Sequence, residues 1–118
     1  MPRPKGKKDQ NIYALGRQLF DAFMGYDEQR VREILPKLAV AFKSKALRTF
    51  TRRYGKLDLI VKVGNIDFKN YRFELDIFNE NGKHLGTYRV TNALQFWSKN
   101  DVKFTIYFFH KFVQRLCS

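Results

Sequence analysis

The sequence predicts an α+β protein in which N-terminal helices pack on an antiparallel sheet of four to five strands. Up to about residue 50, apolar residues recur at every third or fourth position, which is typical of amphipathic helices. From Leu57 onward they recur at every second position, which is typical of strands with one buried face. With 44% hydrophobic and 16% aromatic residues, the 118-residue chain has enough apolar material for one packed core.

Two segments are expected along the chain: a flexible basic arm at residues 1–9 and a single α+β domain at residues 10–118. The arm holds two prolines, one glycine and four cations, so it cannot bury enough surface to offset the entropy lost on ordering. No apolar run approaches the roughly 20 residues that cross a membrane, and no secretory signal opens the chain. These features favour an intracellular protein, cytoplasmic or nuclear, that does not contact membranes.

Three helices are expected in the first half of the domain. The first runs from about residue 10, with Asn11 as its N-cap, and stops at Gly25. The second begins after Asp27, which can cap it. Because proline lacks an amide donor and disfavours helical geometry in the residue before it, a break or kink is expected between Leu35 and Pro36. Pro36 would then open a third helix over residues 36–53.

The third helix divides into an apolar side and a cationic side when it is drawn at about 100° per residue. The apolar side would pack on the core. The cationic side forms a ridge, and residues 34–57 contain no Asp or Glu at all. Seven cations fall in this acid-free window: Lys37, Lys43, Lys45, Arg48, Arg52, Arg53 and Lys56.

The second half of the domain is expected to hold the strands. Alternation predicts strands at residues 57–63, 71–77 and 84–91, and the pair Asn81–Gly82 predicts a tight hairpin between the last two. Further strands are expected at residues 93–98 and 102–108, the latter from the alternation of Val102, Phe104, Ile106 and Phe108.

The residues that catalysis requires are scarce. His84 and His110 form no metal-binding pair on one element, and Cys117 alone makes neither an internal disulfide nor a multi-cysteine zinc site. Glu74 and Asp76 are expected on the outer face of a strand, paired with cations of a neighbouring strand. No glycine-rich phosphate loop is present. The sequence therefore predicts no catalytic residue, metal or cofactor, and it favours a protein that is not an enzyme.

The net charge of +12 favours nucleic acid, RNA or DNA, or another polyanion as the partner. Nine of these excess charges belong to residues 1–56. The predicted interface combines the arm with the ridge and its extension: Arg3, Lys5, Lys7, Lys8, Lys37, Lys45, Arg48, Arg52, Arg53 and Lys56, together with Tyr54. The aromatic side chains considered for stacking on unpaired bases are Tyr54, Tyr88, Trp97 and Tyr107.

Several segments resemble parts of the nuclear transport factor 2-like superfamily. Residues 19–27, Leu-Phe-Asp-Ala-Phe-Met-Gly-Tyr-Asp, are similar to that superfamily's helix with a Gly-Asp-like turn, and residues 87–90, 94–97 and 102–106 resemble its paired final strands. The resemblance implies that the sheet is strongly curved, with the helices packed in its concave side. No position matches a catalytic motif of the superfamily.

Two alternative functions follow from the resemblance and the apolar pattern. One is a pocket that binds a small ligand or carries out a lyase- or isomerase-type reaction, lined by Phe73, Leu75, Tyr88, Phe96 and Phe104. The other is a protein-interaction module, including a homodimer through the sheet, with Ile60, Phe78 and Phe109 exposed on the outer face.

Overall fold

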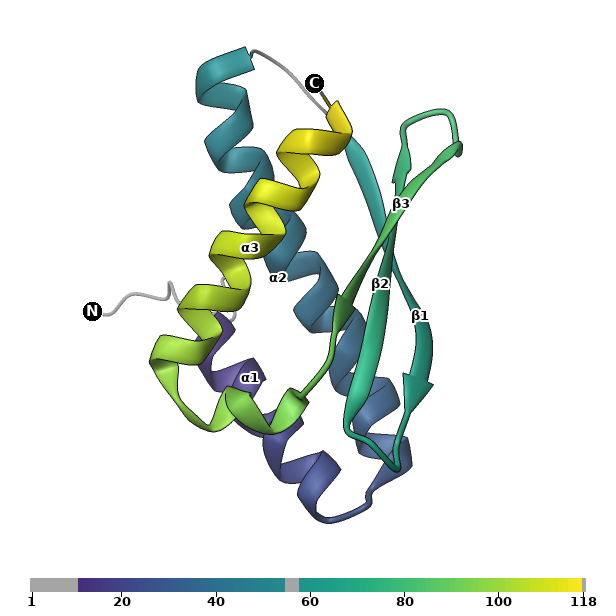
Figure 1. The fold of residues 1–118 in the computed structure, drawn as a ribbon, viewed down its shortest axis with the longest axis vertical. Coiled ribbons are helices and arrows are strands. Elements are labelled where there is room, and N and C mark those ends of the chain that lie inside the picture. The colour runs from purple at the N-terminus through teal and green to yellow at the C-terminus, as the bar shows by residue number, and fades with distance from the viewer. Residues whose placement is uncertain (1–10, 55–57, 118) are drawn as a thin grey trace, which may run out of the picture.

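The computed structural model describes residues 11–54 and 58–117, and within residues 49–54 it describes the helix but not the side chains. The fold is α+β, as predicted, and the chain forms two N-terminal helices, three strands, a short 3₁₀ helix and a C-terminal helix (Figure 1). Their order is α1 (Ile12–Met24), α2 (Glu28–Tyr54), β1 (Leu59–Asp67), β2 (Arg72–Asn79), β3 (His84–Val90), η2 (Ala93–Trp97) and α3 (Lys99–Cys117). The expected basic arm at residues 1–9 lies outside the described residues.

The helix α2 runs the length of the molecule (Figure 1). Its 27 residues span about 40 Å at 1.5 Å per residue, which matches the longest dimension of 41 Å. The sheet packs beside α2, and α3 crosses over the C-terminal half of α2 (Figure 1). The core lies between these three layers.

The first two helices begin where the sequence predicts. The Oδ1 atom of Asn11 accepts a hydrogen bond from the backbone N–H of Tyr13, which caps α1, and Gly25 ends this helix. The Oδ1 atom of Asp27 accepts from the backbone N–H of Arg30, which caps α2. Capping residues thus fix both starts.

The predicted break at Leu35–Pro36 is wrong, because α2 continues through Pro36 as one helix to Tyr54. A proline inside a helix costs about 3 kcal/mol. Each large apolar side chain that is fully buried contributes about 1.5–3 kcal/mol, and four such residues flank the proline on one stripe: Ile34, Leu35, Leu38 and Phe42. Pro36 itself is exposed. Burial of the stripe therefore outweighs the cost of the proline.

The first three predicted strands and the hairpin are confirmed. The strands pair antiparallel in the order β1-β2-β3, with Lys62 opposite Asp76 and Glu74 opposite Arg89. At the hairpin, the side chain of Asn79 accepts from the backbone N–H groups of Asn81 and Lys83, and Gly82 has a φ of +87°, a conformation that favours glycine.

The two strands predicted at residues 93–98 and 102–108 are wrong. Residues 93–97 form a 3₁₀ helix capped by Asn92, and it buries Ala93 and Phe96. Residues 99–117 form α3, which buries residues at spacings of four, three and four: Val102, Ile106, Phe109 and Val113. Val102 and Ile106 are four residues apart, a spacing that places them on one face of a strand or of a helix. Only a helix also buries Phe109 and Val113 on that face. Within residues 11–54 and 58–117, the sheet has three strands rather than four to five.

The strongly curved sheet expected from the superfamily resemblance is also absent, because the three described strands form an open sheet that does not curl around the helices (Figure 1). The residues named for the alternative pocket lie in different environments. Phe73, Leu75 and Phe96 are buried in the core, where the rings of Phe73 and Phe96 lie 6.2 Å apart. Phe104 lies on the outside of α3, 59% exposed. Among the described helices, none is both long and apolar enough to cross a membrane.

Candidate nucleic-acid interface

Cations follow one side of α2, away from its buried stripe. Lys37 and Arg48 are exposed there, and Lys45 is half-buried. No carboxylate of the described residues forms an ion pair with Lys37 or Arg48. The ridge predicted from the sequence therefore exists on α2, over the residues whose side chains are described.

The other residues predicted to contact nucleic acid have no described side chains. Arg52, Arg53 and Tyr54 belong to the last turn of α2, where the structure describes the backbone alone. Lys56 and the four arm residues lie outside the described residues: Arg3, Lys5, Lys7 and Lys8. Their part in the interface stays a prediction.

A second cationic surface lies on α3, and it was missed because this segment was predicted to be a strand. After Asp101, α3 carries cations but no carboxylate: Lys103, Lys111 and Arg115. Three aromatic side chains project from the same helix into solvent: Phe104, Tyr107 and Phe108, which are 59%, 53% and 55% exposed. The helical spacing of Val102, Ile106, Phe109 and Val113 was the signal that could have revealed this face.

The cationic side of α2 and the helix α3 meet at His110. Burial lowers the pKa of His110, and the positive charge of Lys45 lowers it further. The Nε2 atom of His110 is buried and forms no hydrogen bond with any described group. Lys45 of α2 therefore lies near His110 of α3, where the two helices pack. We define the α2–α3 seam as the line where the two helices pack, together with the described cations of their acid-free segments: Lys37, Lys43, Lys45 and Arg48 of α2, and Lys103, Lys111 and Arg115 of α3.

The seam combines two acid-free segments that are far apart in the sequence. Residues 34–54 of α2 hold six Lys or Arg residues, and residues 102–117 of α3 hold three. Neither segment contains Asp or Glu. The fold therefore packs together two helices whose acid-free segments hold nine cations in total.

The aromatic residues considered for stacking differ in their burial. Tyr88 packs against Phe109 and Phe112, at centroid distances of 5.3 and 5.6 Å, and its hydroxyl donates to the carbonyl oxygen of Thr105. Burial raises the pKa of Tyr88 to about 12. Tyr88 therefore belongs to the core, whereas Tyr107 is exposed. Trp97 is 62% exposed and lines a separate groove of about 310 Å³ with Arg17 and Lys99.

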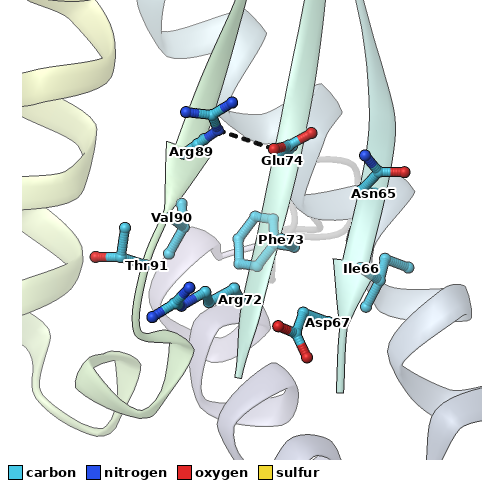
Figure 2. A pocket seen from close by; sticks show the side chains of 9 residues that line it. All are labelled: Asn65, Ile66, Asp67, Arg72, Phe73, Glu74, Arg89, Val90 and Thr91. Atoms are coloured by element: carbon cyan, nitrogen blue, oxygen red, sulfur yellow. Dashed lines mark hydrogen bonds and ion pairs between the residues drawn. The ribbon is translucent and has the colours of Figure 1, made fainter. Parts of the chain in front are cut away.

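A groove of about 470 Å³ on the sheet offers a contrasting surface (Figure 2). Figure 2 shows Arg89 and Glu74 pointing toward one another from β3 and β2, and the Nε atom of Arg89 donates to Glu74 Oε2 at 2.9 Å. Asp67 and Arg72 occupy paired positions at the ends of β1 and β2. Hydrogen bonds from Asn70 lower the pKa of Asp67, as does the charge of Arg72. Two arginines and two carboxylates line this groove, so its charge is balanced.

Polar side chains on the outer face of the sheet also form hydrogen bonds with one another. Thr87 donates to Asp76 Oδ1 at 2.6 Å, and His84 Nε2 lies 3.1 Å from the hydroxyl of Thr87. The expectation that Glu74 and Asp76 pair with cations of a neighbouring strand is confirmed for Glu74, which pairs with Arg89. Asp76 instead accepts from Thr87 of the neighbouring strand. A sheet dimer was expected to use exposed Ile60, Phe78 and Phe109. This prediction is wrong for Phe109, which is fully buried.

Within the described ranges, no three His, Cys, Asp or Glu side chains gather as they would in a metal site. Comparison of the chain with known protein families, with curated proteins and with solved structures finds no match.

Proposed function

We propose that the protein is a non-enzymatic nucleic-acid-binding protein that holds phosphate groups along the α2–α3 seam. The observation that carries the proposal is the acid-free pair of helix segments, with nine cations and no carboxylate. A nucleic acid is a regular array of phosphates, and each Lys or Arg that neutralises one of them releases condensed counterions. Cations spread along two packed helices suit such an array better than they suit a small anion.

The proposed interface is independent of the core. Lys37 and Arg48 are exposed on α2, while the residues that hold this helix in place lie on its buried side: Val31, Leu35, Leu38 and Phe42. Reversing the charge of Lys37 and Arg48 should therefore change binding without unfolding the protein.

The test measures the affinity for a fluorescent oligonucleotide, single-stranded or duplex, by anisotropy as the salt concentration is raised. For four phosphate contacts on a duplex, we expect the affinity to fall about a hundredfold between about 50 and 200 mM salt. The pair Lys37→Glu and Arg48→Glu should weaken binding at every salt concentration. It should also lower the slope of log affinity against log salt by about 1.4–1.8, the value for two lost contacts.

The matched control makes the same charge change on the sheet half, with Lys69→Glu and Lys83→Glu, both exposed. This control should keep most of the affinity and the original slope, since the two lysines lie away from the seam. Binding that does not depend on salt would contradict the proposal. So would equal losses in the two double variants, because the net charge alone would then explain the affinity.

A further inference from the structure

The outward face of α3 carries three large aromatic side chains that the core does not use. Phe104, Tyr107 and Phe108 follow the helical spacing i, i+3 and i+4, and each is more than half exposed. The rings of Tyr107 and Phe108 meet edge to face at 5.4 Å. We call these three residues the aromatic platform.

The platform is separate from the aromatic residues that stabilise the fold. Phe109 lies on the opposite side of α3, fully buried, with its ring 5.3 Å from both Phe42 and Tyr88. Because successive residues are turned by about 100°, a helix cannot bury both sets against one core. In soluble proteins, a contiguous patch of exposed apolar side chains often marks a binding surface.

The charges around the platform identify the kind of partner. The Nζ atom of Lys111 lies 5.5 Å from the ring centroid of Tyr107, and Lys103 is exposed one residue before Phe104. Asp101 lies one turn before Phe104 on the same side of α3, and no further carboxylate occurs in residues 102–117, where three cations follow. The excess of cations favours an occupant that is anionic and that also presents flat or apolar groups. A second copy of this face does not qualify, since it would bring the same cations together.

We propose that the platform stacks unpaired bases of a single-stranded nucleic acid whose phosphates contact Lys103 and Lys111. The inference rests on the proposed function and specifies its ligand, because bases within a duplex are stacked on one another and cannot use the platform. Every base has a π-face, so stacking on Phe or Tyr tolerates any sequence. Cations beside the rings supply the phosphate contacts that a strand needs.

The arrangement of the cations favours a strand over an anionic membrane. On a helical wheel, Lys111 lies between Tyr107 and Phe104, in the middle of the outward face. In a helix that lies on a membrane, the apolar face enters the acyl region and the cations occupy the polar side. A strand instead alternates bases with phosphates, so rings and cations on the same face each find a partner.

The experiment compares two labelled single strands of equal length, oligothymidine and the same backbone without bases. Both carry the same phosphates, so their difference in affinity reports stacking. We expect the wild-type protein to bind oligothymidine roughly ten- to a hundredfold more tightly, the equivalent of one stacked base or more. The pair Phe104→Ala and Phe108→Ala should remove most of this preference, leaving the affinity for the abasic strand and the salt slope unchanged.

The control is Trp97→Ala, which removes an exposed aromatic ring outside the platform and should preserve the preference. Circular dichroism verifies the fold, and Tyr107→Ala provides a second variant that should lower the preference by itself. Equal affinity for the two strands overturns the platform but leaves the proposed function standing, whereas no binding to either strand overturns both. Loss of preference in Trp97→Ala equal to that in the platform variant, or platform-dependent binding to phosphatidylglycerol vesicles without any base preference, also overturns the inference.

Discussion

The sheet and the helix pair treat their charges in opposite ways. Residues 58–91, which form the sheet and its turns, contain five cations and five carboxylates, for a net charge of zero. The acid-free segments of α2 and α3 contain nine cations and no carboxylate. On the sheet, Glu74 is paired with Arg89, and Asp76 accepts from Thr87. The sheet therefore satisfies its polar groups within the protein, and the unbalanced charge is concentrated on the helices.

The two regions also differ in how they treat outward aromatic residues. Phe78 on the sheet is half-buried, with Lys62 Nζ 5.7 Å above its ring and the ring of His84 edge to face at 5.2 Å. Phe104 and Phe108 on α3 remain more than half exposed. Aromatic residues therefore occur on both surfaces, but only those on α3 leave more than half of the side chain exposed to a partner. Exposure locates such a surface better than residue type does.

The largest expected effect tests whether α3 faces the core and the solvent as described. Phe109→Ala should lower the free energy of unfolding by about 3–5 kcal/mol, because it leaves a cavity between Phe42 and Tyr88. Its neighbour Phe108→Ala should change this free energy by about 0.5 kcal/mol or less, since its ring is already 55% exposed. Urea unfolding followed by circular dichroism measures both. Equal losses would show that α3 has no distinct outward face.

A smaller effect should appear when the protein is brought to mildly acidic pH. Burial, with the charge of Lys45, keeps the pKa of His110 below its unfolded-state value of 6.5. His110 therefore contributes stability that is complete above about pH 6.5 and is lost as the pH falls through its lower folded-state pKa. The pKa of Asp67 on the sheet is also lowered, by Asn70, but its contribution is present above its ordinary value of 3.8 and is lost only in stronger acid.

Urea unfolding between about pH 7 and pH 5 measures this difference between the regions. The free energy of unfolding should decrease in the wild-type protein, and the variant His110→Gln should show a weaker decrease. An unchanged pH profile in His110→Gln would mean that the helix pair is not the acid-sensitive region.

The smallest expected effect concerns the pair between Arg89 and Glu74. Arg89 is 73% exposed, so solvent screens the interaction, and Arg89→Ala should lower the free energy of unfolding by about 0.2–1 kcal/mol. The affinity for oligonucleotides should not change, because Arg89 is engaged with Glu74 and lies on the sheet. A loss of affinity comparable to that of Lys37→Glu with Arg48→Glu would remove the distinction between the two regions.

The elements that the sequence predicts correctly carry local signals that agree with the tertiary structure. Asn11 and Asp27 cap helices through their own side chains, and Asn79 with Gly82 shapes the hairpin, so short windows suffice. The continuation of α2 through Pro36 could not be predicted in this way, since the local cost of proline is outweighed by burial against distant residues.

The candidate site was predictable as a set of charges but not as a surface. The acid-free window of α2 is visible in the sequence, and the structure places Lys37 and Arg48 on its exposed side. The aromatic platform was not found because residues 102–108 alternate as a strand would. The helical period is recognised only when Phe109 and Val113 are included, one and five residues beyond Phe108, where the alternation ends.

The length of α2 gives the molecule an electric polarity. Its first two turns hold Glu28 and Glu33 beside Arg30 and Arg32, for a net charge of zero, whereas Lys and Arg are the only charged residues after them on this helix. The two ends lie about 40 Å apart, beyond the Debye length of about 8–10 Å at physiological ionic strength, so they experience an outside field independently. Near a polyanion, the protein should therefore rotate until the C-terminal end of α2 leads. Encounters would then begin with the molecule already oriented, which raises the association rate most in dilute salt.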